Sequence, residues 1–148
     1  MESTLRTVDT FPPFGLPSAN VGEEDYGFAS GTAVLRTDGI GPCLGIVIYS
    51  PERKYGSLAH ISGFRKVPKV VRPENIVETM LSGMDNHTAL VAYLAGESWT
   101  DDDVSRTVAK RLKKNGVMVM DTDLGIVPKG RSMLLYCDSG KVEVYRYQ

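Results

Sequence analysis

Two apolar segments joined by a short polar turn lie in the middle of the chain and constrain its fold most. Residues 44–49 are rich in β-branched and aromatic side chains, and residues 55–61 contain mostly small and apolar side chains. Residues 50–54 between them contain the proline and charged side chains that are typical of a turn. This pattern predicts a β-hairpin with one strand on each side of the turn.

The hairpin brings a cysteine and a histidine to the same end. Cys43 comes directly before the first segment, and His60 lies seventeen residues later, near the end of the second. A turn centred between Pro51 and Glu52, or on Glu52, places Cys43 opposite His60 or Ile61. Directly opposed residues have Cβ atoms about 4.5–5.5 Å apart, so we expect the thiol and the imidazole within hydrogen-bond reach.

A cysteine nucleophile needs such a neighbour. A free thiol has a pKa of about 8.5 and is mostly protonated at pH 7, whereas a nearby imidazole can activate it. Thr37, six residues before the cysteine, ends a short apolar segment. Its hydroxyl or carbonyl is expected to accept the proton of the other ring nitrogen of His60, which is the orienting role of a third triad member.

Residues 38–42 form a Gly-rich turn that leads into Cys43. We expect Gly39 and Gly41 to adopt positive φ and to direct their N–H groups toward a substrate carbonyl, as an oxyanion hole requires. Pro42 has no N–H, so it removes one donor beside the nucleophile.

The stretch GIGPCLGIVIYSPERKYGSLAH resembles the signature of CheD, the chemoreceptor glutamine deamidase family of bacterial and archaeal chemotaxis. Thr37, Cys43 and His60 fall on the catalytic threonine, cysteine and histidine of that family, and the spacing between cysteine and histidine agrees. The likeness extends from about Asn20 to the end of the chain. The catalytic domain of the cytotoxic necrotizing factor toxins resembles it in fold and in its Cys/His pair.

The resemblance implies a protein-glutamine deamidase that converts glutamine side chains on chemotaxis receptors to glutamate through a Cys43 thioester. It implies a protein substrate and, as a further partner, a CheC-type phosphatase; no metal and no cofactor are expected. Two alternatives stay open. Because Pro42 stands where the family has serine, the chain could be a catalytically weak regulatory module that binds a CheC-type phosphatase or a receptor. It could also be a deamidase or esterase of the same fold that acts on a non-chemotactic protein.

Composition limits the other possibilities. A chain of 148 residues with 42% hydrophobic and 24% charged residues can form one globular core without disulfides. The net charge of -1 provides no basic field for nucleic acid or a membrane surface, and no apolar segment approaches the ~18 residues of a membrane span. Cys43 and Cys137 could pair, but no signal peptide is apparent, so we expect thiols in the cytoplasm.

The remaining segments predict a domain with more strands than helices. Residues 1–19 contain three prolines and predict an extended or mobile arm, whereas residues 20–148 predict the deamidase-like domain. Thr100 is expected to cap a second helix, with Asp101, Asp102 and Asp103 in its first turn rather than in a metal site. The other expected elements are strands within 21–35, a helix from Pro73 to Gly83, a strand at 88–95, a strand at 117–120, a loop at 121–129 and a hairpin of 131–138 with 141–147.

This order of elements predicts an α+β fold. The family resemblance implies a packed β-sandwich of mixed or antiparallel strands that is flanked by two α-helices.

Overall fold

A computed structural model describes residues 5–63, 66–85, 87–96 and 104–148. Over these residues, the strands form two five-stranded sheets. The first sheet has the order β1 (Leu5–Val8), β10 (Lys141–Arg146), β9 (Arg131–Tyr136), β4 (Val34–Ile40) and β2 (Ala19–Asn20). The second sheet has the order β3 (Asp25–Ser30), β6 (Tyr55–Ile61), β5 (Leu44–Ser50), β7 (Val91–Gly96) and β8 (Met118–Leu124).

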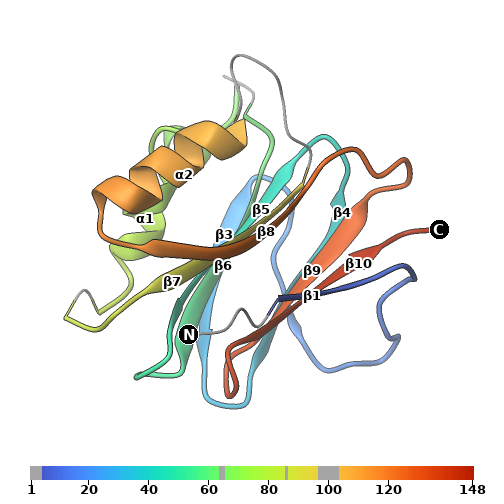
Figure 1. Ribbon diagram of the computed structural model, residues 1–148, viewed down its shortest axis with the longest axis horizontal. Coiled ribbons are helices and arrows are strands. Elements are labelled where there is room, and N and C mark those ends of the chain that lie inside the picture. Colours follow the sequence, from blue (N-terminus) through green and yellow to red (C-terminus); the bar gives the residue numbers. More distant parts are fainter. Residues whose placement is uncertain (1–4, 64–65, 86, 97–103) are drawn as a thin grey trace.

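The two sheets pack face to face, and helices α1 (Ile76–Leu81) and α2 (Val104–Lys114) cover the outer face of the second sheet (Figure 1). The side chains of strand β5 contact both of the layers that lie against the second sheet. Leu44, Ile46 and Ile48 pack with the helices, whereas Val47 and Tyr49 pack against the first sheet. Because side chains alternate along a strand, an almost continuous apolar segment serves both layers. The predicted α+β sandwich with two flanking helices is confirmed.

The central hairpin has the predicted strands but a different register. Strand β6 spans the predicted residues, and β5 runs one residue further than expected, to Ser50. Ser50 pairs with Tyr55 and Gly45 pairs with His60, so the prediction that Cys43 lies directly opposite His60 or Ile61 is wrong. The turn contains four residues between the paired ends, and Lys54 adopts a left-handed φ of 49°. The centre of this turn lies between Glu52 and Arg53, and this displacement shifts the pairing by one to two positions.

Strand β8 corrects a second prediction, because residues 121–124 continue the strand instead of forming a loop. Parallel pairing with β7 continues as far as Leu124 opposite Gly96. Asp123, only 5% exposed, forms ion pairs with Arg131 at 2.9 Å and with Arg146. A buried carboxylate is tolerated when it is paired and hydrogen bonded, and here both partners come from the other sheet.

Helix α1 and strand β7 also begin later than predicted. Helix α1 begins at Ile76 rather than at Pro73, and β7 begins at Val91 rather than at residue 88. A 3₁₀ turn, η1 (Lys69–Val71), precedes α1. The predicted cap of α2 at Thr100 and Asp101–Asp103 lies outside the described residues. Within the described ranges, neither helix has the length and apolar character that a bilayer-spanning segment needs.

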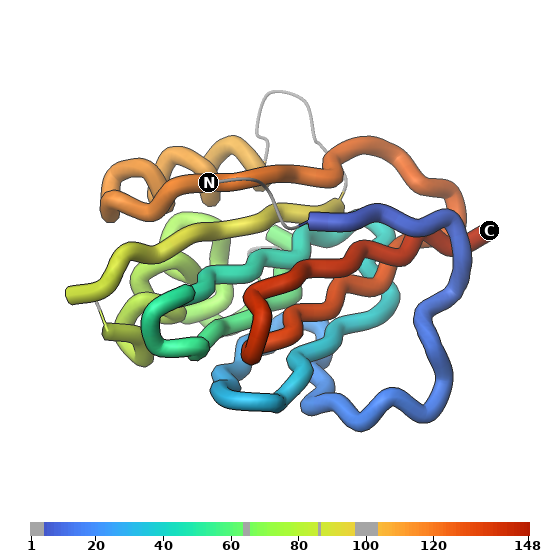
Figure 2. Tube along the Cα trace, turned by 60° about the horizontal axis from the view of Figure 1, so that its bottom comes forward, coloured from blue at the N-terminus to red at the C-terminus, as the bar shows by residue number. Residues whose placement is uncertain are grey.

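Both ends of the chain contribute to the first sheet. Strand β1 pairs in parallel with β10, and β2 pairs in parallel with β4. In Figure 2, the dark blue segment that contains β1 lies beside the red strand β10. The division into an arm of residues 1–19 and a domain of residues 20–148 stays a prediction.

Candidate active site

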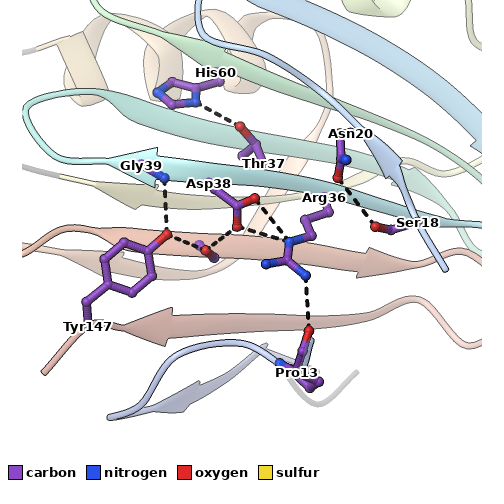
Figure 3. Close-up of polar contacts among 10 residues, drawn as sticks. Pro13, Ser18, Asn20, Arg36, Thr37, Asp38, Gly39, His60 and Tyr147 are labelled. Atoms are coloured by element: carbon purple, nitrogen blue, oxygen red, sulfur yellow. Dashed lines mark hydrogen bonds and ion pairs between the residues drawn. The ribbon is translucent and has the colours of Figure 1, made fainter. Parts of the chain in front are cut away.

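Thr37 and His60 meet between the two sheets. Thr37 lies on β4 of the first sheet and His60 on β6 of the second, and each is 1% exposed. Thr37 Oγ1 lies 2.8 Å from His60 Nδ1 (Figure 3). The contact that the sequence predicted is therefore present, and it fixes the orientation of the ring across the sandwich.

The second ring nitrogen of His60 is available for chemistry. Among the described residues, buried Nε2 has no hydrogen-bond partner. Burial lowers the pKa of His60 below its ordinary value, while the charges of Glu23 and Asp38 act in the opposite direction. Desolvation favours the neutral imidazole at pH 7. When Nδ1 carries the proton and donates it to Thr37, Nε2 is an acceptor.

Cys43 lies at the same end of the sandwich and in the core layer between the sheets. It comes directly before β5, is 4% exposed and packs in the apolar cluster that faces the first sheet. Continuing the register by one residue places Cys43 diagonally across from His60, since Gly45 is the residue opposite the histidine. Diagonal neighbours are about 7–8 Å apart, within reach of longer side chains. No hydrogen bond joins the thiol to Nε2 here, and catalytic hydrogen bonds commonly tighten only when substrate binds.

Two glycines shape the space around the cysteine. A Cβ on Gly45 would lie 2.8 Å from Ile40 Cδ1 and 2.9 Å from Met133 Sδ, so core side chains of the first sheet fill the position opposite His60. Gly96 ends β7 with a φ of 151°, and a side chain there would collide with the carbonyl of Cys43. The end of β7 can therefore pack directly against the backbone of Cys43.

The Gly-rich turn begins as a β-bulge. Thr37 pairs with Met133 and Ile40 with Arg131, so β4 has one extra residue in this interval. Gly39 has the expected positive φ, at 70°, whereas Gly41 is not among the residues with positive φ. The Gly39 N–H donates to Tyr147 Oη at 3.1 Å, and the Gly41 N–H donates to the Gly39 carbonyl at 2.9 Å. Both expected oxyanion donors are thus engaged within the protein in this conformation.

A polar network holds the bulge (Figure 3). The Tyr147 hydroxyl hydrogen bonds to Ser132 Oγ, which donates to Asp38, and Asp38 pairs with Arg36 at 3.0 Å. Sequence reasoning missed Ser132 and Tyr147 because they lie 94 and 108 residues from their partners in the bulge. No local pattern signals contacts over such separations.

Sequence reasoning also missed Glu23. Cys43 Sγ lies 3.8 Å from Glu23 Oε1, and the Glu23 charge acts on His60 as well. The acidic run of residues 23–25 was visible, but nothing local distinguishes its first member from an ordinary surface residue. Across the described ranges, no group of three or more His, Cys, Asp or Glu side chains is arranged to hold a metal ion.

A solved structure shares the fold. The crystal structure of Neisseria meningitidis protein NMB0706 superposes with a TM-score of 0.54 at 13% identity, covering 75% of this chain and 64% of that one. At this identity the likeness concerns the fold alone.

Sequence relatives are more informative. No family model matches the chain. Several curated proteins named "Probable chemoreceptor glutamine deamidase CheD" do match. The relative from Thermococcus kodakarensis is 30% identical, and the alignment covers 84% of this chain and 89% of that protein. The relative from Desulforamulus reducens is 28% identical, and the alignment covers 88% of this chain and 91% of that protein. The relative from Archaeoglobus fulgidus is 27% identical, and the alignment covers 84% of this chain and 90% of that protein. This chain therefore belongs to the CheD family.

Proposed function

We propose that this protein is a protein-glutamine deamidase in which Cys43 is the nucleophile, His60 the acid and base, and Thr37 the residue that orients the imidazole. The contact between Thr37 and His60 Nδ1 carries the proposal, because it leaves Nε2 without a hydrogen-bond partner among the described residues. Cys43 packs on the same face of the second sheet as His60. The names of the relatives support glutamine as the substrate and a chemoreceptor as the protein that presents it.

The first half-reaction forms a thioester. His60 Nε2 takes the proton of the Cys43 thiol, and the thiolate attacks the carboxamide carbon of the glutamine. The C–N bond then breaks as the imidazolium returns the proton to nitrogen, and ammonia leaves. The γ-glutamyl group stays bound to Cys43 Sγ.

The second half-reaction consumes water. His60 removes a proton from a water molecule that attacks the thioester carbon, and the C–S bond breaks to regenerate the thiol. The product is glutamate, so each turnover adds one negative charge to the substrate protein. Such a charge changes local helix packing and electrostatics.

The tetrahedral intermediates need N–H donors for their oxyanion. In this proposal, Gly39 or Gly41 supplies a donor only after its N–H leaves its present acceptor. A shift of the bulge at residues 38–39 on substrate binding would release the Gly39 N–H from Tyr147. Pro42 contributes no donor.

The proposal is tested by incubating the protein with the cytoplasmic domain of a chemoreceptor and mapping deamidated sites by mass spectrometry. Each converted glutamine gains about 1 Da as its amide is hydrolysed. Cys43→Ala should lower the rate at least about a thousandfold. Cys137→Ala is the matched control and should deamidate normally. Full activity in Cys43→Ala would exclude the mechanism.

We propose that a CheC-type phosphatase binds the protein in the cytoplasm, as the family resemblance implies. Titration of purified phosphatase against the wild type and Cys43→Ala tests this by calorimetry. Binding without any receptor deamidation would instead favour the regulatory module.

A further inference from the structure

The carboxylate of Glu23 belongs to an exposed residue and touches the buried thiol of Cys43. Glu23 is exposed to solvent, whereas Cys43 is 4% exposed, and Oε1 lies 3.8 Å from Sγ. A substrate side chain that reaches the sulfur from solvent therefore meets this carboxylate at the point of attack.

The backbone holds Glu23 at this position from both sides. The Val21 N–H donates to the Arg36 carbonyl on the first sheet, and the Glu24 N–H donates to the His60 carbonyl on the second, both at 2.7 Å. Glu24 also adopts a left-handed φ of 61°, which turns the chain sharply after Glu23. Residues 21–24 thus bridge the two sheets beside the site.

The charge of the same carboxylate also acts on His60. The Glu23 charge raises the pKa of His60 against the dominant effect of burial. One acidic side chain therefore acts on both the nucleophile and the base, from a position that solvent and substrate can reach.

A carboxylate can only accept hydrogen bonds, and a glutamine carboxamide carries two N–H donors, whereas a glutamate carboxylate carries none. We propose that Glu23 determines substrate specificity in the deamidase site by accepting a hydrogen bond from the carboxamide nitrogen and repelling the carboxylate of the product. This inference rests on the proposed function.

The contact also couples substrate binding to activation of the thiol. In the resting protein, the S–H donates to Glu23 Oε1. When a carboxamide N–H takes this acceptor, the thiol proton passes from Sγ to His60 Nε2, and the Sγ–C bond forms. The C–N bond then breaks on the side that Glu23 holds, and the proton on Nε2 leaves with ammonia. Water is the only other reactant.

Two alkylating reagents of matched size test the preference directly. Iodoacetamide carries a primary carboxamide, and iodoacetate carries the corresponding carboxylate. The ratio of their rates at Cys43 should fall about tenfold in Glu23→Gln relative to the wild type, because charge-assisted recognition of the amide and repulsion of the carboxylate are both lost. Glu52→Gln removes the same charge from an exposed residue in the hairpin turn and should keep the wild-type ratio.

Deamidation kinetics provide the second measurement. With the chemoreceptor domain as substrate, Glu23→Gln should lower kcat/KM about tenfold, and the fully deamidated domain should inhibit it more strongly than it inhibits the wild type. The acidic limb of the pH–rate profile should move to lower pH, since the charge that raises the pKa of His60 is gone. Because Glu23 is exposed, the thermal midpoint should match that of Glu52→Gln.

The outcomes separate the two proposals. If Glu23→Gln and Glu52→Gln show equal alkylation ratios and equal product inhibition, the role of Glu23 is refuted while Cys43-dependent deamidation by the wild type still stands. If the wild type deamidates no glutamine, the proposed function fails. The alkylation ratio then still decides whether Glu23 selects carboxamides at the thiol.

Discussion

Cys43 and Cys137 share a residue type, a core layer and almost complete burial, yet their surroundings differ. Both pack in the cluster between the sheets, at 4% and 0% exposure, and they are not joined in a disulfide. Cys137 lies near the far end of β5, where its carbonyl accepts a hydrogen bond from Tyr49 Oη at 2.5 Å. Burial raises the pKa of the Cys137 thiol to about 11.

Cys43 has polar neighbours that Cys137 lacks among the interactions described. A carboxylate lies against its sulfur, and a histidine shares its face of the sheet. Burial alone makes a thiol inert, because the thiolate loses its hydration. We therefore expect reactivity in this core to depend on which polar side chains the loops and the opposite sheet bring to each end.

Alkylation by iodoacetamide in the native state should separate the two thiols most strongly. A pKa of about 11 leaves Cys137 with at least about a hundredfold less thiolate at pH 7 than an ordinary cysteine, so we expect Cys43 to react at least about a hundredfold faster. Peptide mass spectrometry follows both sites in one sample. In concentrated urea the alkylation rates of the two thiols should converge. Similar rates in the native protein would contradict the difference between their surroundings.

Removing the Thr37 hydroxyl should lower the reactivity of Cys43 and leave that of Cys137 unchanged, which sharpens the comparison of the two thiols. Thr37→Val keeps the shape but frees the imidazole from its 2.8 Å contact, so deamidation should fall about tenfold to a hundredfold and Cys43 alkylation should slow, while Cys137 is unaffected. Thr37→Ser should restore most of the activity.

Thr88→Val is the matched control for this variant. The Thr88 hydroxyl makes a buried 2.9 Å hydrogen bond with Ser50 at the turn end of β5 and donates to the Asp85 carbonyl at 2.9 Å, so Thr88→Val removes threonine hydrogen bonds away from the site. Both variants should lose about 1–3 kcal/mol of stability. Equal activity in the two variants would show that the Thr37 contact is only structural.

The smallest effect concerns the pH dependence of stability. The pKa of His60 is lower in the folded protein than the ordinary value of about 6.5, so the unfolded state binds a proton more readily. The free energy of unfolding should therefore decrease as the pH falls below about 6.5. Urea titrations between pH 7.5 and 5 should show a smaller decrease for His60→Gln than for the wild type; parallel curves would contradict the burial of this imidazole.

Elements with a strong local pattern could be predicted from the sequence. The span of β6, helix α2 as the second helix and the closing hairpin of β9 and β10 follow from apolar periodicity and turn residues. The contact between Thr37 and His60 was also predicted, although the catalytic roles of Thr37, Cys43 and His60 stay proposals. The register was missed because residues 51–54 carry no signal that distinguishes a turn centred between Glu52 and Arg53 from one centred a half or one residue earlier.

By itself, the sequence determined the types of most elements and the presence of a cysteine, a histidine and a threonine near one hairpin. Only the tertiary structure decided that Asp123 belongs to a strand, that Tyr147 holds the bulge at Gly39 and that Glu23 touches the thiol. The physical reason is the range of the interactions. Helix and strand preferences arise between residues a few positions apart, whereas these contacts form only when two sheets and a connecting segment pack together.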